Sequence, residues 1–359
     1  MYDCLVVGGG LIGMLTAREL STSGLSVAIV EQGECGRESS WAGGGILSPL
    51  YPWRYAYAVT ALASWSQTHY PAFIKGLYQE TGIDPEFQQN GLLILDTDES
   101  ERALSWARLG QSSLQQISFK EIKVLEPQLG VIPDSALWMP EVGQIRNPRM
   151  VKSMRESLLK QGVKLYENSQ VQGLFVDQDY IKGVVTAEGE IRAKKVVLAG
   201  GAWTSQLLSS TGVNLAIKPV RGQMILFRGE PGLISRIVLS QDRYVIPRRD
   251  GRVLFGSTLE DTGFDKSITD SAREELQQAA YRLIPALKQY EIEHHWAGLR
   301  PASPEGIPYI GEHPHITGLY INTGHYRNGV VLGLASARLL ADMMLQREPI
   351  MDFQAFKIK

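Results

Sequence analysis

Three glycines near the N-terminus, Gly8, Gly10 and Gly13, have the GxGxxG spacing of a turn that holds a dinucleotide. In such a turn the first glycine allows a tight bend, the second allows close approach to a pyrophosphate, and the third lets a helix pack closely on a strand. Glu31 lies at the spacing where a carboxylate contacts the ribose hydroxyls of an adenosine. These residues predict a dinucleotide site; the alternative is a glycine-rich turn in an ordinary α/β protein.

The segments around the glycines are those that such a site requires. Apolar residues 4–7 predict a strand, the glycines then begin a helix that continues to Leu20, and residues 27–30 predict a second strand that leads into Glu31. The helix N-terminus offers free N–H groups and positive dipole to phosphates. Strand, turn, helix, strand and acid coincide here, which favours the dinucleotide site over a simple turn.

Arginine and histidine are the other residue types that suggest chemistry. Arg300 follows an apolar strand and precedes Pro301, so we expect it at a strand end, where a guanidinium can bind a carboxylate through two parallel hydrogen bonds. The alternative for such an arginine is a solvated surface residue. His294 and His295 are adjacent in a predicted strand and point to opposite faces, so at most one can face a site.

Several further residues are predicted to take no part in chemistry. Arg243, Arg248 and Arg249 are expected to be surface charges around a hairpin. The six histidines have no zinc-binding spacing, and we predict no metal site. The sequence also contains no P-loop and no Ser–His–Asp order.

The remaining pattern predicts an α/β domain that is interrupted by an antiparallel section. In the first part, helices are predicted at 55–69, from Pro71 to Glu80 and at 147–162, and strands at 171–176, 180–187, 190–192 and 196–199. In the antiparallel section, strands are predicted at 220–227, 243–247, 252–256 and 291–299, with an Asp250-Gly251 turn and a helix at 270–283. The last part predicts a strand at 319–322, a loop to Asn328 and a helix from 329 to about 345.

Composition excludes several classes of protein. The 359 residues suffice for two domains or one large one, and 44% hydrophobic residues with a net charge of −2 are typical of a globular protein without a basic surface for nucleic acid. Cys4, expected to be buried, and Cys35 form neither a metal cluster nor a disulfide framework. No apolar run approaches the roughly 20 residues that span a bilayer, and the N-terminal strand leaves no room for a signal peptide. We therefore expect a cytoplasmic protein.

Four segments give the chain a resemblance to the D-amino-acid-oxidase-like superfamily of FAD-dependent oxidoreductases, within which it is most similar to the bacterial glycine oxidases. The segments are 6–13 with Glu31, 39–46, 296–301 and 324–329. The first is shared by all Rossmann proteins, whereas the last two are more specific to amine-oxidising flavoenzymes. The resemblance extends over nearly the whole chain and implies FAD. Neither cysteine lies in the loop where relatives with covalent flavin carry an attachment residue, so we expect noncovalent FAD.

The resemblance also implies a fold. We expect an α/β fold, with a Rossmann-type FAD-binding domain (GR2-like) and an inserted α+β substrate domain built on an antiparallel sheet. Residues 1–80, 145–218 and 305–359 are predicted to form the FAD-binding domain, and residues 81–144 and 219–304 the substrate-binding domain. The flavin is then held between the two domains.

Cofactor contacts are expected from four loops at the carboxyl ends of the strands, residues 8–13, 33–46, 200–203 and 323–329, because an open α/β sheet binds its ligand there. The resemblance places Leu11 and Ile12 at the pyrophosphate and Val171 on the adenine side. The full set of predicted FAD-binding residues is Gly8, Gly10, Leu11, Ile12, Gly13, Glu31, Gln32, Ser39, Ser40, Gly44, Gly45, Ile46, Val171, Gly201, His325, Tyr326, Arg327, Asn328, Gly329, Val330 and Val331.

Tyr244, Arg300 and Arg327 are the predicted catalytic and substrate-binding residues. The resemblance implies that Arg300 binds the substrate carboxylate, that the Tyr244 hydroxyl bonds the same group, and that Arg327 reaches the substrate from the flavin side. We expect Leu259 or Ile46 to exclude bulky side chains from the pocket.

The implied activity is oxidative deamination of glycine, sarcosine and D-alanine. Hydride passes from the substrate Cα to flavin N5, O2 is reduced to H2O2, and the imine hydrolyses to a 2-oxo acid (glyoxylate from glycine) and ammonia, or supplies thiamine thiazole synthesis. No base is needed if the amine has already lost its proton. The alternatives are a sarcosine-type secondary-amine oxidase, a D-amino-acid dehydrogenase with another electron acceptor, an FAD-stabilised binding protein and an NAD-dependent dehydrogenase. We also expect a homo-oligomer.

Overall fold

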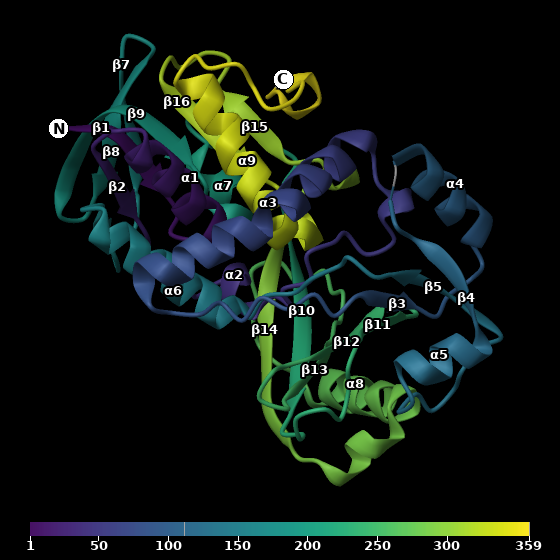
Figure 1. The fold of residues 1–359 in the computed structure, drawn as a ribbon. Coiled ribbons are helices and arrows are strands. Elements are labelled where there is room, and N and C mark those ends of the chain that lie inside the picture. Colours follow the sequence, from purple (N-terminus) through teal and green to yellow (C-terminus); the bar gives the residue numbers. More distant parts are fainter. Residues whose placement is uncertain (111, 359) are drawn as a thin grey trace.

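Two eight-stranded β-sheets, each with helices packed on it, build the molecule (Figure 1). The computed structural model describes residues 1–110 and 112–358. Both termini lie beside the first sheet, and the second sheet extends away from it along its two longest strands, β10 and β14 (Figure 1). The observed architecture is the mixed α/β fold that the sequence predicts.

The first sheet is mainly parallel. Its strand order is β15-β16-β9-β1-β2-β6, and β8 and β7 continue from β9. The pairs among β16, β9, β1, β2 and β6 are parallel, whereas β15, β8 and β7 join through antiparallel pairs. The strands are β1 (Tyr2–Val7), β2 (Val27–Val30), β6 (Lys164–Tyr166), β7 (Gly173–Asp177), β8 (Tyr180–Thr186), β9 (Gly189–Leu198), β15 (Tyr309–Glu312) and β16 (Leu319–Thr323). The carboxyl ends of the parallel strands therefore meet at one edge.

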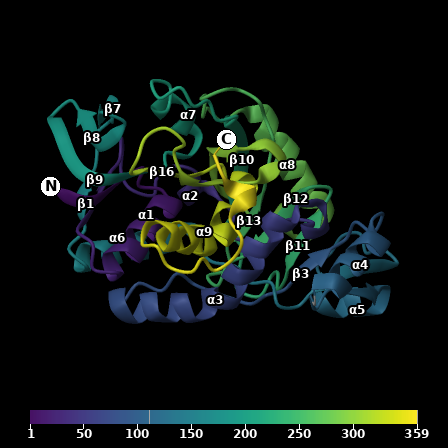
Figure 2. The same ribbon diagram turned by 90° about the horizontal axis from the view of Figure 1, so that it is seen from above.

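Both faces of the central strand β1 are covered. Cys4 and Val6 belong to the core cluster under the helices, whereas Leu5 and Val7 belong to the cluster on the opposite face. Because successive strand residues point to opposite faces, a strand in this place must be apolar throughout. The helices of the first cluster lie together in Figure 2 and are α1 (Leu11–Thr22), α3 (Tyr57–Thr81), α6 (Asn147–Lys160) and α9 (Gly329–Met344).

The second sheet is antiparallel except for one parallel pair, β3 with β11. Its order is β14-β10-β13-β12-β11-β3-β5-β4. The strands are β3 (Leu92–Ile94), β4 (Gln115–Ser118), β5 (Ser135–Met139), β10 (Lys218–Phe227), β11 (Ile237–Ser240), β12 (Arg243–Pro247), β13 (Val253–Gly256) and β14 (Ile292–Ala302). Helices α5 (Phe119–Leu125) and α8 (Asp270–Leu283) bury one face. The other face carries Met224 and Tyr244, with α4 (Ser100–Gly110) packed over its far end.

Local sequence signals account for several helix ends. Thr269 caps α8 by accepting a hydrogen bond from the Ala272 N–H, and Gly82 ends α3 with a φ of +72°, where glycine avoids the strain of a side chain. Pro148 lies in the first turn of α6, where its missing N–H costs nothing. The predicted bounds of α8 are those observed.

Two predictions of element boundaries were wrong. Pro71 does not begin a helix, because α3 continues through it as one helix of 25 residues. Tyr70 and Ile74 on either side of the proline are buried in the first core cluster, and this packing offsets the local cost of proline. The strands predicted at 190–192 and 196–199 are one strand, β9, whose first half pairs with β8 and whose second half pairs with β1.

The strands of the second sheet come from two separate stretches of chain, β3 to β5 and β10 to β14. The division into an FAD-binding and a substrate-binding domain, as predicted from the sequence, therefore stays a proposal.

The short helices are α2 (Ser39–Ala42), α7 (Thr204–Leu207), η1 (Pro52–Arg54), η2 (Gly201–Trp203), η3 (Pro285–Gln289), η4 (Pro304–Gly306), η5 (Tyr326–Asn328) and η6 (Gln354–Phe356). Within residues 1–110 and 112–358, no helix combines the length and the apolar character needed to cross a membrane.

Candidate functional site

A long cavity begins at the carboxyl edge of the first sheet and continues to the second sheet. On the first side it is lined by residues that follow β1, β2, β9 and β16, among them Gly8, Glu31 and Gly200. On the second side it is lined by side chains of β12 and β14, including Tyr244 and Arg300. All four loops that the sequence assigns to the ligand contribute lining residues, because parallel strands bring their following loops to one edge.

At Gly8 and Gly13 the glycine turn leaves no room for a Cβ. Gly8 has a φ of +109°, and a Cβ on it would lie 2.4 Å from the Ala199 carbonyl oxygen. A Cβ on Gly13 would lie 1.9 Å from the Gly8 carbonyl oxygen, so the third glycine serves packing and does not line the cavity. Helix α1 begins at Leu11 with no acidic residue in its first turn. The turn therefore presents a helix N-terminus suited to an anion.

Glu31 is held at the cavity by two backbone N–H groups. Its Oε2 accepts a hydrogen bond from the Gly9 N–H at 2.7 Å, and its Oε1 accepts one from the Gly33 N–H at 2.9 Å. Val171 lines the cavity at the same end, together with its neighbours Ser169 and Gln170. The carboxylate ties the glycine turn to the loop after β2, and it keeps lone pairs for ribose hydroxyls.

The segment 39–46 is hydrogen-bonded to helix α1 on one side and to strand β14 of the second sheet on the other. The Ser40 hydroxyl accepts a hydrogen bond from the Leu11 N–H at 2.8 Å, and the Ser39 hydroxyl donates one to the Leu299 carbonyl on β14 at 2.6 Å. The Trp296 indole donates to the Ala42 carbonyl at 3.0 Å. At Gly45 the φ is +82° and a Cβ would lie 2.1 Å from the Ile145 carbonyl oxygen. Small residues therefore let this backbone lie against the cavity.

Arg300 lies at the far end of the cavity, within β14 rather than after it. Its guanidinium donates to the Ser257 hydroxyl at 2.5 Å and to the Thr258 carbonyl at 3.2 Å. Among the described residues no carboxylate pairs with it, whereas the buried Arg221 pairs with Glu260 and Asp265. The pKa of Arg300 lies below its ordinary value, and burial of the guanidinium is the largest cause. An arginine in this position is suited to an anionic ligand.

The other two predicted substrate residues are electrostatic neighbours of Arg300. The nearby Tyr244 raises the pKa of Arg300, whereas the positive charge of Arg327 lowers it. Both line the cavity, Tyr244 from β12 and Arg327 from η5 just before α9. The Tyr244 side chain is buried, and its hydroxyl lies 3.8 Å from the Met224 sulfur. The structure thus brings the three predicted substrate residues to one end of the cavity.

His325 lines the cavity but is poorly suited to proton transfer. Its Nε2 lies 2.9 Å from the Ser336 hydroxyl, and only 2% of the residue is exposed. Burial lowers the pKa of His325 to about 3, so the ring is neutral at ordinary pH.

Eighteen of the 21 predicted FAD-binding residues line the cavity, and Gly13, Asn328 and Val331 do not. Asn328 ends η5 and Val331 lies in the first turn of α9, and both residues are buried. Leu259, predicted to limit side-chain size, is 57% exposed and is also absent from the lining, whereas Ile46 is present.

Sequence reasoning missed several lining residues. They include Ser48, Leu50, Leu207, Gly222 and Met224. Alternation along β10 could have put Gly222 and Met224 on one face, but only the pairing of β10 with β14 shows that this face meets the cavity.

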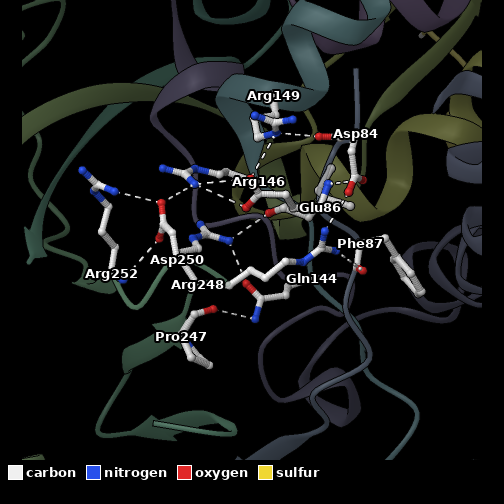
Figure 3. Close-up of polar contacts among 12 residues, drawn as sticks. Asp84, Glu86, Phe87, Gln144, Arg146, Arg149, Pro247, Arg248, Asp250 and Arg252 are labelled. Carbon is white, nitrogen blue, oxygen red and sulfur yellow. Dashed lines mark hydrogen bonds and ion pairs between the residues drawn. The ribbon is translucent and has the colours of Figure 1, made fainter. Parts of the chain in front are cut away.

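The prediction that Arg248 is a surface charge was wrong. Only 9% of Arg248 is exposed, and its guanidinium donates to the Gln144 side chain (Figure 3). It also donates to the carbonyls of Ile145 and Gly44. Arg249 is exposed and pairs with Asp84, as predicted for a surface charge. Arg243 is only partly exposed and donates to the Ser257 carbonyl and to Glu275.

Comparison with known proteins gives matches over nearly the whole chain. A sequence profile of the family described as FAD dependent oxidoreductase matches residues 3–343. The glycine oxidase of Pseudomonas aeruginosa is 53% identical over 349 residues, which cover 97% of this chain and 96% of that protein. The bifunctional protein ThiO/ThiG of Trichormus variabilis is 32% identical over 352 residues, covering 96% of this chain and 53% of that protein. The crystal structure of glycine oxidase from Geobacillus kaustophilus superposes with a TM-score of 0.94 at 30% identity, covering 100% and 98% of the two chains.

Proposed function

The chain belongs to the FAD-dependent oxidoreductase family, and we propose that it is a glycine oxidase that deaminates glycine and other small amines oxidatively. The observation that carries this proposal is the pair Arg300 and Tyr244 at the far end of a cavity that begins at a dinucleotide turn. Arg300 has no carboxylate partner among the described residues, and the carboxylate of an amino acid supplies one.

The residues that line the cavity fit FAD. Gly8 lines the cavity with backbone and has no room for a Cβ beside the Ala199 carbonyl. It forms a cradle with the N-terminus of α1, whose first turn has no acidic residue. Glu31 and Val171 lie at one end of the cavity and Arg300 at the other, which suits an extended cofactor with the adenosine at the first end. The loop of small residues at Gly44 and Gly45 lets backbone approach a flat ring.

We propose that Arg300 binds the substrate carboxylate through two hydrogen bonds and that the Tyr244 hydroxyl bonds the same group. FAD bound in this cavity would supply the two-electron oxidation of the substrate amine, with O2 as the final acceptor that gives H2O2. The side chains thus orient the substrate and exclude water.

The protein need not supply a base. Among the described lining residues the carboxylates are Glu31, which bonds Gly9 and Gly33, and Glu38, which pairs with Lys266. His325 is held by Ser336, and burial lowers its pKa to about 3. We therefore propose that glycine loses its ammonium proton to solvent before the Cα–H bond breaks. The imine then hydrolyses to glyoxylate and ammonia.

The proposal extends to cofactor attachment, assembly and role in the cell. Cys4 and Cys35 are buried and neither is among the described lining residues, which favours noncovalent FAD. We also propose a cytoplasmic homo-oligomer whose imine product supplies thiamine thiazole synthesis. The relationship to ThiO/ThiG of Trichormus variabilis supports this last point.

The test is an H2O2 assay of the purified yellow protein with glycine, sarcosine, D-alanine, D-proline and L-alanine. We expect H2O2 from glycine and sarcosine, less from D-alanine and none from L-alanine. The carboxylate is anchored and the Cα–H must point at the flavin, so only one position at Cα remains for a side chain. Flavin reduction by glycine in air without H2O2 would instead indicate a dehydrogenase. A protein whose flavin none of these compounds reduces would overturn the proposal.

A further inference from the structure

Arg248 is a buried cation whose partners are all neutral. It follows β12 directly, and 9% of the residue is exposed. Its guanidinium donates to the Gln144 side-chain oxygen at 2.7 Å, to the Ile145 carbonyl at 3.0 Å and to the Gly44 carbonyl at 2.7 Å. Burial lowers the pKa of Arg248 to about 10, and nearby Arg146 adds to the lowering. A surface role does not explain a cation that is desolvated in this way.

The contacts of Arg248 join segments that are far apart in the sequence (Figure 3). The Gln144 amide also donates to the Pro247 carbonyl at 2.9 Å, so the end of β12 and residue 144 hold each other. The Ile145 N–H donates to the Gly45 carbonyl at 2.9 Å, and Ile46 forms a bridge to Gln144. Arg248 therefore lies where segment 44–46, segment 144–145 and β12 meet.

Gly44 links this junction to the cavity. It lines the cavity, while its carbonyl oxygen is bonded to Arg248, which is not among the described lining residues. A Cβ on Gly44 would lie 3.1 Å from Cε2 of Tyr244 and 2.8 Å from Cδ1 of Ile246. Strand β12 thus contacts Gly44 through the Tyr244 ring and, one residue beyond its end, through the Arg248 guanidinium. The distance between Gly44 and Tyr244 depends on both contacts.

We infer that Arg248 is a positioning residue, which holds the cavity-lining segment 44–46 in register with the substrate residue Tyr244. This inference rests on the proposed function, in which segment 44–46 faces the flavin and Tyr244 binds the substrate. The planar guanidinium reaches two segments at once, since Nη1 donates to Gln144 and Ile145 and Nη2 donates to Gly44. A lysine can satisfy only part of these acceptors. Without the guanidinium, the Gly44 carbonyl lacks this hydrogen-bond partner, and the segment relaxes.

The test compares Arg248→Met, Arg248→Lys and the matched control Arg249→Met in the FAD-loaded protein. Arg249 is adjacent and exposed, and it contacts Asp84 and the Phe87 carbonyl outside the cavity. We expect Arg248→Met to bind FAD more weakly and to change the shape of the visible absorption band. The flavin-reduction rate at saturating glycine should fall about tenfold or more, because a small misplacement of reacting groups slows catalysis strongly. The apparent Kd for glycine should change less than threefold, because Arg300 is untouched.

Arg248→Lys should lie between Arg248→Met and the wild type in both absorption and rate, and Arg249→Met should match the wild type. If Arg248→Met does not fold, Arg248→Lys carries the same test. A variant that only loses thermal stability, with wild-type absorption and wild-type reduction rate per bound flavin, would overturn the inference. If the wild type binds FAD but oxidises no amine, the proposed function fails, whereas absorption and FAD affinity still report on Arg248.

Discussion

Removing the Arg300 guanidinium should lower the rate of amino-acid oxidation without lowering the affinity for FAD. Arg300 makes two hydrogen bonds to neutral groups, Ser257 and Thr258, and no ion pair within the described residues, so Arg300→Ala breaks no internal salt bridge. Removing one partner of a desolvated charge pair costs about 2–5 kcal/mol. At about 1.4 kcal/mol per tenfold, kcat/KM for glycine should fall about 30- to 4000-fold. Arg300→Lys should recover only part of this, because an ammonium cannot form the two-pronged contact.

Gly222 allows the same prediction to be tested with Arg300 in place. A Cβ on Gly222 would lie 2.0 Å from Nη1 of Arg300, and the flexible guanidinium is the group that must move. Gly222→Ala should therefore lower kcat/KM about 10- to 100-fold through misplacement of the guanidinium. Gly76→Ala, in α3 with no atom within 4 Å of the added Cβ, is the control and should leave activity unchanged.

The assay measures glycine-dependent H2O2 formation and anaerobic flavin reduction, with FAD content and thermal stability determined for each variant. The reasoning is refuted if Arg300→Ala keeps kcat/KM within threefold of wild type while it retains FAD. It is also refuted if the wild type oxidises methylamine, which has no carboxylate, as well as it oxidises glycine.

Three further predictions concern the cofactor end and His325. Glu31→Ala should weaken FAD binding by about one to two decades, since a hydrogen bond to a charged group is worth about 1.5–3 kcal/mol; FAD titration within twofold of wild type would contradict this. Gly8→Ala should be purified with less FAD than the wild type, because its Cβ would lie 2.4 Å from the Ala199 carbonyl oxygen and would displace the turn. A variant with the wild-type FAD content would contradict the role of Gly8 in the cofactor site. Burial lowers the pKa of His325 to about 3, so the unfolded chain binds the proton more readily than the folded protein. The contribution of His325 to stability is therefore full above about pH 6.5 and falls by about 1.4 kcal/mol per pH unit between about pH 6.5 and pH 3. Urea unfolding of His325→Gln should lack this part of the pH dependence, whereas the exposed-site variant His294→Gln should retain it.

Local patterns were enough to predict the dinucleotide turn and most long elements. Gly8, Gly10 and Gly13 act through their own backbone and their neighbours, and the Gly8 φ of +109° is a local requirement that the sequence records directly. Helix α8 was also predicted with its observed ends, and in the structure Thr269, the residue before it, caps its N-terminus.

The short strands β3, β4 and β5 were not predicted from the sequence. Each has three to five residues, and β3 is held by pairing with β11 and β5, both distant along the chain. A strand of this length has too weak a period to be recognised, and its partners decide whether it forms. Pro71 illustrates the reverse case, in which packing keeps a helix where a local signal predicts a break.

The sequence by itself determined the dinucleotide turn, the acid that follows β2 and, through its resemblance, the trio Tyr244, Arg300 and Arg327. Only the tertiary structure decided that Arg248 is buried and bonded to Gly44, whereas its neighbour Arg249 is exposed. The physical reason is that the conformation of a turn or cap depends on adjacent residues, whereas the burial of a side chain depends on which distant segments fold over it. In this protein the cavity forms only when both sheets are in place, and the burial of Arg248 beside it depends on the same packing.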